Sequence, residues 1–554
     1  MNGHITLAIL ASALCSTQAP ANTVQLPVDG GQVLGAQMKT LRVFKGVPYA
    51  DPPVKQLRWR PPQPVSPWQG VRKAVAYSPA CPQIGNYPTD AEQEPTSEDC
   101  LTLNVWTPAA KGSAKLPVMV WIHGGGLMNG SGSVPQYAGD QLASRGVVVV
   151  TLNYRLGVLG FLSHPELNKE SPDGISGNYG LLDQIAALKW VQRNISTFGG
   201  DPDRVTIFGQ SSGAFSVSML VASPLAQGLF RRAIGQSGGV FEPVELDPSF
   251  TPSGAAEGGE RFATRAGKST IAELRKLPAD LLLKARFSPQ YVIGGDVLPL
   301  APHDAYVSNR QNKVDLLVGS NTSEGSFFFD PKSVTVANFN SVLAQTYPSL
   351  LLWAVGASPG RSDAEARDAA VAIDTDMRFA WDMWAWARLA AKDKQRRVFL
   401  YRFAGKPAYR ASHPLYGLGP THGGELPFVF GNLDPRAADW TVQDHALAQK
   451  MQQYWVNFAK TGDPNGPGLP IWQQFDARDG RAMQLGQPTG EITLTDETRL
   501  KRIDRVYSVA RFISGHRNGL LAIGAGVVAL FLFFLVKLLP RLAAQFAGRR
   551  RHTD

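Results

Sequence analysis

The sequence predicts an α/β fold in which a mostly parallel central sheet is flanked by helices. Two short runs, 116–122 and 147–152, are almost entirely apolar, as expected for strands that are covered on both faces. Residues 178–198 repeat apolar side chains at helical spacing, and another strand follows near Val205. Because strands and helices alternate along this part of the chain, a parallel sheet with connecting helices is favoured.

The beginning of the chain has the pattern of an export signal. Residues 5–14 form an apolar run that is too short to span a bilayer. Ala19-Pro20-Ala21 matches a small-x-small cleavage site. We therefore expect residues 1–21 to be a signal peptide.

The next segment, residues 41–81, is rich in proline. Proline cannot sit in central strands, so we expect irregular surface chain here. Residues 97–106 then have the alternation of a strand. In an exported protein, the even pair Cys81 and Cys100 is most simply a disulfide, and a reduced, buried pair is the alternative.

The stretch 204–214 combines a β-branched strand, a tight turn and the start of a helix. Gly209, Ser211 and Gly213 in the turn have the Gly-x-Ser-x-Gly spacing of a nucleophile elbow. Glycine is needed on both sides because larger residues would clash in so sharp a turn. The helix over 212–222 directs its partially positive N-terminus toward the serine. Ser211 is therefore the candidate nucleophile.

A nucleophilic serine needs a base, and the base needs an acid that orients it. His422 is the favoured base because flanking glycines allow its loop to aim an imidazole, and His413 is the alternative. Glu324 is the favoured acid because it follows the strand predicted at 314–318, and strand ends form the catalytic edge of such sheets. Asp315 and Asp330 are weaker candidates for the acid. The chain order of serine, acid and histidine is the one expected of α/β-hydrolases.

A second glycine motif, His123-Gly124-Gly125-Gly126, follows the strand at 116–122. Glycines let backbone N–H groups approach a substrate oxygen, so this motif predicts an oxyanion hole. Standing alone it would be no more than a glycine turn. Together with the serine turn and the two candidate partners, it predicts a serine hydrolase.

The charge of the chain is concentrated at its end. Of a formal net charge of +10, ten Lys or Arg and two Asp lie at or after Lys501. The body is therefore nearly neutral, which argues against nucleic acid as a partner. Residues 519–536 carry no charged side chain and are long enough to cross the core of a bilayer.

A basic stretch follows this apolar run, which fits the cytoplasmic side of a membrane. We expect an exported protein whose catalytic domain lies outside and is anchored by one C-terminal span. The expected organisation is a domain over residues 22–505, a linker over 506–518, a transmembrane helix over 519–539 and a basic cytoplasmic tail over 540–554.

These motifs are part of a wider resemblance. The chain resembles the type-B carboxylesterases, the family that includes the cholinesterases, over roughly residues 25–490. The motifs that carry this resemblance are, in order, Phe44–Ala50, Glu98–Leu101, the glycine motif at 123–126, Asn178–Gln184, Phe198–Pro202, the serine turn, Gln236–Gly238, the Glu324 motif, the His422 motif and Phe458–Asn465.

The resemblance implies an α/β-hydrolase fold and a carboxylic-ester hydrolase that forms an acyl-enzyme. We expect no cofactor and no metal. The roles that it implies are Ser211 as nucleophile, Glu324 as acid, His422 as base, the N–H groups of Gly125, Gly126 and Ser212 as oxyanion donors, and Cys81–Cys100 as a disulfide.

Two departures from the family concern the substrate. Gln210 stands where the family commonly has Glu, which removes a negative charge beside the site. The loop between Cys81 and Cys100 has no Trp, whereas cholinesterases use a Trp there to hold choline by a cation–π contact. We therefore expect a neutral or apolar small-molecule ester rather than a choline ester.

Other functions are compatible with the same fold. A lipase, a thioesterase or an acyl transferase would use the same groups. A non-catalytic adhesion protein of this fold would usually lack one member of the triad, and all three are present here. The aromatic runs 327–329 and 379–384 either line an apolar acyl pocket or are simple core.

Overall fold

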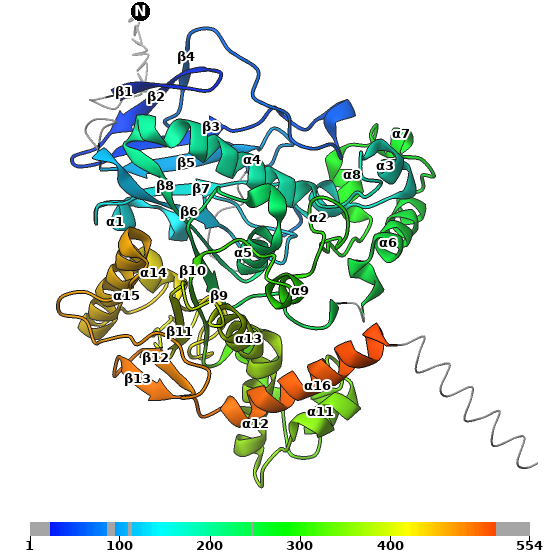
Figure 1. The fold of residues 1–554 in the computed structure, drawn as a ribbon, viewed down its shortest axis with the longest axis vertical. Coiled ribbons are helices and arrows are strands. Elements are labelled where there is room, and N and C mark those ends of the chain that lie inside the picture. Colours follow the sequence, from blue (N-terminus) through cyan, green and yellow to red (C-terminus); the bar gives the residue numbers. More distant parts are fainter. Residues whose placement is uncertain (1–22, 86–94, 109–113, 245–246, 517–554) are drawn as a thin grey trace, which may run out of the picture.

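The computed structural model describes residues 23–85, 95–108, 114–244 and 247–516, which form a single 13-stranded sheet covered by helices (Figure 1). The strand order is β1-β2-β3-β5-β7-β6-β8-β9-β10-β11-β12-β13, and β4 pairs with β2. Successive pairs in the run β7-β6-β8-β9-β10-β11-β12 are parallel, whereas β1–β2, β2–β3, β3–β5, β5–β7 and β12–β13 are antiparallel. The short strand β4 runs parallel to β2. The strands are Thr23–Val28 (β1), Gly31–Gln37 (β2), Arg42–Pro48 (β3), Val71–Lys73 (β4), Thr102–Thr107 (β5), Leu116–Ile122 (β6), Val148–Leu152 (β7), Gly200–Gln210 (β8), Arg232–Gln236 (β9), Asp315–Asn321 (β10), Val398–Phe403 (β11), Arg481–Leu485 (β12) and Gly490–Thr493 (β13).

Helices cover both faces of this sheet. A π-helical turn, Asp376–Ala380, joins α12 to α13 without a break. The helices are Asp140–Ala143 (α1), Gly157–Phe161 (α2), Pro165–Glu170 (α3), Tyr179–Asn194 (α4), Ser212–Ala222 (α5), Pro252–Arg265 (α6), Ile271–Leu274 (α7), Ala279–Lys284 (α8), Pro302–Val307 (α9), Phe339–Leu343 (α10), Ser349–Val355 (α11), Asp363–Thr375 (α12), Trp381–Ala390 (α13), Leu426–Phe430 (α14), Val442–Thr461 (α15) and Glu497–Gly515 (α16).

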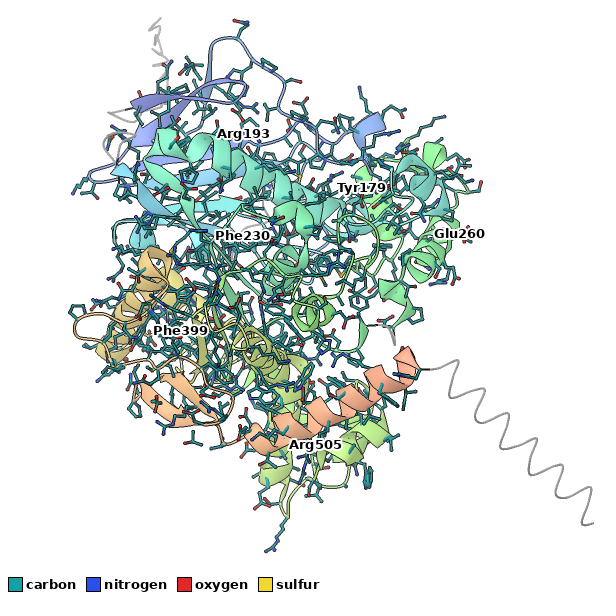
Figure 2. The ribbon with its side chains drawn as sticks, viewed as in Figure 1. Tyr179, Arg193, Phe230, Glu260, Phe399 and Arg505 are labelled. Atoms are coloured by element: carbon teal, nitrogen blue, oxygen red, sulfur yellow. A yellow bond between two sulfur atoms is a disulfide. The ribbon has the colours of Figure 1, made fainter. Side chains whose placement is uncertain are left out.

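The side chains of the central strands alternate between two cores. Val118 and Val120 of β6 pack into the core that holds α4, α5 and α13. Met119 and Trp121 of the same strand pack into the opposite core, with α14 and α15. Phe399 of β11, labelled in Figure 2, belongs to the α15 side and is 1% exposed. Both faces of these central strands are buried, which explains why their sequences are apolar without interruption.

The predicted parallel sheet with flanking helices is present, and the strand at 116–122 and the helix at 212–222 have the predicted bounds. Residues 42–48, expected to be irregular, instead form β3, which pairs antiparallel with β5. Gly46 and Pro48 weaken the strand pattern in the sequence. In the structure, however, Gly46 has a φ of 69° where the register shifts, and Pro48 is the last residue of the strand.

The prediction of a C-terminal membrane helix is corrected. Within the described ranges 23–85, 95–108, 114–244 and 247–516, no helix combines the length and the apolar character needed to cross a membrane. The C-terminal helix in that part, α16, carries charged residues along its length, with Arg505 on its exposed side (Figure 2). It packs on α11 and α13 through Leu500 and Ile503. Residues 519–539 lie outside the described part, so the anchored localisation inferred from them has no structural support.

Two other predicted segments also need comment. Residues 506–515, expected to begin a linker, are the second half of α16. The expected signal peptide, residues 1–21, and the expected basic tail, residues 540–554, lie outside the described residues.

Candidate active site

The serine turn connects β8 directly to α5. Ser211 lies between the two elements with a φ of 57°, a left-handed value that is strained for a non-glycine residue. A Cβ on Gly213 would lie 2.1 Å from the carbonyl oxygen of Ile122. A Cβ on Gly209 would lie 2.6 Å from the backbone of Gly213. The glycines on both sides are therefore required by close backbone packing, as the sequence suggested.

The glycine motif after β6 lies beside this turn. Gly125 and Gly126 have φ values of 109° and 64°, which favour glycine. A Cβ on Gly124 would lie 3.1 Å from the Cβ of Ser211. The backbone N–H directly after Gly126 donates to Ser212 Oγ at 3.2 Å, which ties the loop to the start of α5. These contacts bring the glycine motif next to the serine turn.

Glu324 and His422 meet at the same edge of the sheet. Glu324 follows β10, and His422 precedes α14. His422 Nδ1 donates to Glu324 Oε2 at 2.7 Å, with the carboxylate fully buried and the imidazole 5% exposed. Because the proton is held on Nδ1, the neutral imidazole presents the lone pair of Nε2 as an acceptor.

The alternative candidates lie elsewhere. His413 stacks on Tyr409 and accepts from the N–H of Leu415. Asp315 is at the opposite end of β10, 3.8 Å from Arg232, and Asp330 caps a short turn at residues 331–333. None of the three takes the place of Glu324 or His422.

Gln210 connects the serine turn to the imidazole. Its side chain is fully buried, and its Nε2 lies 3.2 Å from His422 Nε2. The amide N–H therefore donates to the same nitrogen that would accept a proton from serine. From the sequence, Gln210 was expected to be a neutral neighbour of the substrate, whereas in the structure it lies against the candidate base.

Behind Glu324 lies a second layer of polar groups. Ser237 Oγ donates a short hydrogen bond to Glu324 Oε1, and the N–H of Asn321 donates to the same oxygen at 2.7 Å. Asn321 also donates to Glu425 Oε2 at 2.6 Å, and Gln236 donates to Glu425 Oε1 at 3.1 Å. Burial raises the pKa of Glu425, and the nearby charge of Glu324 raises it further. The hydrogen bonds from Asn321 and Gln236 act in the opposite direction and lower the pKa of Glu425, but burial is the largest of these effects.

Aromatic rings surround the imidazole of His422. Phe379, in the π-helical turn, stacks on it with ring centres 4.5 Å apart and an interplanar angle of 10°. Phe327 and Phe328 approach it at 5.7 and 5.2 Å with tilted rings. Part of each aromatic run singled out in the sequence therefore contacts the candidate base.

The expected disulfide is present. Cys81 and Cys100 are bonded, with Cα atoms 5.1 Å apart and both residues buried. The bond closes a loop whose residues 86–94 lie outside the described part of the chain.

No individual role was expected from the sequence for Ser237, Glu425 or Phe379. Ser237 and Glu425 lie inside motifs that the family resemblance had already singled out, so membership of those motifs was an available signal. Phe379 lies in an aromatic run, but nothing in the sequence indicates the π-helical turn that brings its ring onto His422.

Comparison with known proteins agrees with this geometry. The model of the carboxylesterase family matches residues 20–503. The fumonisin B1 esterase of Sphingopyxis macrogoltabida is 39% identical over 465 residues, covering 81% of this chain and 84% of that protein. The para-nitrobenzyl esterase of Bacillus subtilis is 37% identical over 513 residues, covering 86% of this chain and 97% of that protein.

Solved structures show the same relationship. A structure of PNB esterase superposes with a TM-score of 0.75 at 33% identity, covering 86% of this chain and 99% of that one. The carboxylesterase EST55 of Geobacillus stearothermophilus superposes with a TM-score of 0.74 at the same identity and coverage. With its α/β-hydrolase fold, the chain belongs to the carboxylesterase family and is an ester hydrolase.

Proposed function

We propose that the chain hydrolyses carboxylic esters through an acyl-enzyme on Ser211, with His422 as general base and Glu324 as its orienting acid. The observation that carries this proposal is the buried 2.7 Å bond between His422 Nδ1 and Glu324 Oε2. That bond leaves Nε2 as the proton acceptor, and Nε2 is in contact with the residue that precedes Ser211.

The reaction proceeds in two halves. Ser211 Oγ attacks the ester carbonyl carbon while its proton passes to His422 Nε2. The N–H groups of Gly125, Gly126 and Ser212 stabilise the oxyanion that forms. When the carbon–oxygen bond breaks, His422 gives its proton to the leaving alcohol and the acyl group stays on Ser211. Water then attacks the acyl-enzyme with the same proton transfers and releases the acid.

We propose neutral or apolar esters as the substrates. Gln210 is uncharged and fully buried against the imidazole, so the site has no carboxylate at that position to attract a cation. The partly exposed ring of Phe328 and the ring of Phe327 add apolar surface beside the base.

The test is hydrolysis of a series of p-nitrophenyl esters by the full chain and by Ser211→Ala. If the triad acts as a unit, kcat should fall on the order of 10⁶-fold in the variant. A Ser211→Ala protein that is folded and retains more than about a hundredth of the wild-type kcat would contradict the assignment of the nucleophile.

A further inference from the structure

One charged side chain lies inside a buried strand. All six residues of β11 are buried, and Arg402 is 4% exposed among neighbours that are apolar or aromatic. Removing a guanidinium from water is costly unless its donors are satisfied and its charge is balanced. A strand that only filled the core would carry an apolar residue at this position, so the partners of Arg402 indicate its role.

Arg402 joins two elements of the fold. Its Nη1 donates to Ser320 Oγ at 3.2 Å, and the two residues are paired in the register of β10 and β11. Its Nη2 donates to Asp496 Oδ2 at 3.1 Å, at the start of α16. One buried guanidinium therefore bridges the end of β10 and the beginning of α16.

The carboxylate of Asp496 departs from the usual behaviour of its position. Asp496 is the N-cap residue of α16, where an aspartate usually accepts from N–H groups of the first turn. Within the described chain its side chain makes no capping hydrogen bond and accepts from Arg402 instead. Residues that break a local preference in this way are expected where they serve a functional site.

Through Ser320, Arg402 is connected to the catalytic carboxylate. Ser320 is fully buried and directly precedes Asn321 in β10. The N–H of Asn321 donates to Glu324 Oε1 at 2.7 Å. A shift of the strand at Ser320 would therefore move a donor that orients Glu324.

Through α16, Arg402 is also connected to the π-helical turn. Arg499, in the first turn of α16, donates a short hydrogen bond to Asp376, the first residue of the π-helical turn, and α16 packs against this part of the chain (Figure 1). Directly before the turn, Thr375 Oγ1 accepts from the N–H that follows Glu324 at 3.0 Å. Near its end, Phe379 stacks on the imidazole. The turn thus supports both the acid and the base.

The charges link these two connections. The pKa of Asp376 is raised to about 7: burial is the largest cause and the charge of Asp496 adds to it, whereas Arg499 and Arg402 act in the opposite direction. Without Arg402, the protonated form of Asp376 would be more favoured. A neutral carboxyl binds Arg499 less strongly than a carboxylate does, so loss of Arg402 would loosen the π-helical turn as well as β10.

We propose that Arg402 is a positioning residue for the acid–base side of the site, an inference that rests on the proposed serine-esterase function. Among the described residues, no hydrogen bond joins Arg402 to Ser211 or His422. Arg402 acts by fastening β10 to α16, so that Glu324 and Phe379 keep their places against the imidazole.

The test compares Arg402→Met with Arg58→Met in the full chain. Arg58 forms a closely matched ion pair with Glu98: these side chains are 6% and 17% exposed, against 5% and 17% for Arg402 and Asp496. Arg58 otherwise bonds to backbone carbonyls at 274–277. The measured quantities are kcat and KM for p-nitrophenyl acetate, and the low-field proton NMR signal of the hydrogen bond between His422 Nδ1 and Glu324.

We expect Arg402→Met to lower kcat by about ten- to a hundredfold with KM within about threefold, because the orientation of the base changes and substrate binding does not. The NMR signal should shift or broaden. Arg58→Met should be destabilised but keep kcat and the signal at wild-type values. A folded Arg402→Met protein with unchanged kcat and signal would overturn the proposal, and so would equal changes in Arg58→Met.

Ser320→Ala is a milder variant that removes only one hydroxyl, and it tests the proposal even if Arg402→Met fails to fold. We expect kcat to fall by about three- to tenfold and the NMR signal to move in the same direction. The variant with both substitutions should lose no more kcat than Arg402→Met, because Ser320 acts through the guanidinium. Unchanged kcat in Ser320→Ala, or losses that multiply in the combined variant, would contradict the proposal.

The two readouts also separate this proposal from the proposed function. If the folded wild type hydrolyses no p-nitrophenyl ester, the serine-esterase function is overturned. The NMR signal still reports, independently of activity, whether Arg402 holds Glu324 against His422.

Discussion

The nucleophile side and the acid–base side of the site are built in different ways. Around Ser211, positions are fixed by backbone packed on backbone: a Cβ on Gly213 or Gly238 would lie 2.1 or 2.4 Å from a carbonyl oxygen. Around His422, positions are fixed by side chains, including the hydrogen bond from Ser237 to Glu324 and the ring of Phe379. The backbone packing around Ser211 leaves no space for an added atom. Around His422, the loss of one supporting side chain should lower activity only in part.

The largest effect is expected on the nucleophile side. Gly213→Ala places a methyl group 2.1 Å from the carbonyl of Ile122, and neither backbone can move without displacing the sheet or α5. We expect the free energy of unfolding to fall by about 3 kcal/mol or more. Denaturant unfolding of the two proteins measures this difference.

A helical glycine without this crowding supplies the control. At Gly258 in α6, an added Cβ would meet only the end of the Arg261 side chain, at 3.7 Å. Gly258→Ala should therefore be neutral or stabilise the protein by up to about 1 kcal/mol. Equal destabilisation by the two substitutions would refute the idea that backbone packing sets the serine turn.

On the acid–base side, Ser237→Ala removes a hydrogen bond to the buried carboxylate of Glu324. A hydrogen bond to a charged group contributes about 1.5–3 kcal/mol, so kcat should fall by about ten- to a hundredfold while KM changes little. Steady-state kinetics with one p-nitrophenyl ester provides the measurement. Ser218→Ala removes another buried hydroxyl, which bonds only within α5, and serves as the control. A similar loss in both variants would mean that the effect is not specific to the acid.

Phe379→Leu keeps an apolar side chain but removes the ring that stacks on His422. The face of an aromatic ring stabilises a neighbouring cation by about 0.5–2 kcal/mol, and the imidazole is charged while it holds the serine proton. We expect kcat to fall by about three- to thirtyfold with KM nearly constant. Phe339→Leu, at a fully buried position in α10, controls for lost packing. An equal fall in kcat for Phe339→Leu would remove the reason to assign stacking a role.

The smallest expected effect is a pH dependence of the free energy of unfolding that arises from Glu425. Its pKa is raised in the folded protein by burial and by Glu324, so the folded state holds the proton more tightly than the unfolded state. This contribution to stability is complete below the ordinary pKa of glutamate and is lost as pH rises through the raised value. The Gln side chain of the Glu425→Gln variant cannot ionise, so the variant does not lose stability in this way as pH rises.

The free energy of unfolding of Glu425→Gln should therefore increase relative to that of the wild type as pH rises above the ordinary pKa range of glutamate. Denaturant titrations of both proteins at pH 4 to 9 measure this trend, whatever constant offset the substitution adds. A difference that does not change with pH would show that Glu425 ionises normally in the folded protein.

The same contrast explains what could be predicted from the sequence. The serine turn and β6 are local, and their glycine spacing and apolar runs determine them within a dozen residues. Glu324 was identified because it follows the strand predicted at 314–318, and His422 because of the glycines beside it in the sequence. The strand β3 was missed because its pairing with β5 is decided by residues far away in the chain.

The residues that hold Glu324 and His422 in position could not be predicted in this way. Ser237 follows β9, Asn321 ends β10 and Glu425 precedes α14, and only the order of strands in the sheet brings the three together. Phe379 reaches His422 through a π-helical turn whose extra residue leaves no trace in apolar periodicity. The apolar run at 519–536 shows the converse, because its composition alone suggested a membrane span that the described structure does not support.

The central claim is that the acyl group of the substrate is transferred to Ser211. The most direct test is to mix the full chain with p-nitrophenyl acetate, stop the reaction in acid within the first turnover and map the peptides by mass spectrometry. We predict one acetyl group on the peptide that contains Ser211 and none in the Ser211→Ala protein. An acetyl group on another residue, or rapid p-nitrophenol release without any acetylated peptide, would contradict the account.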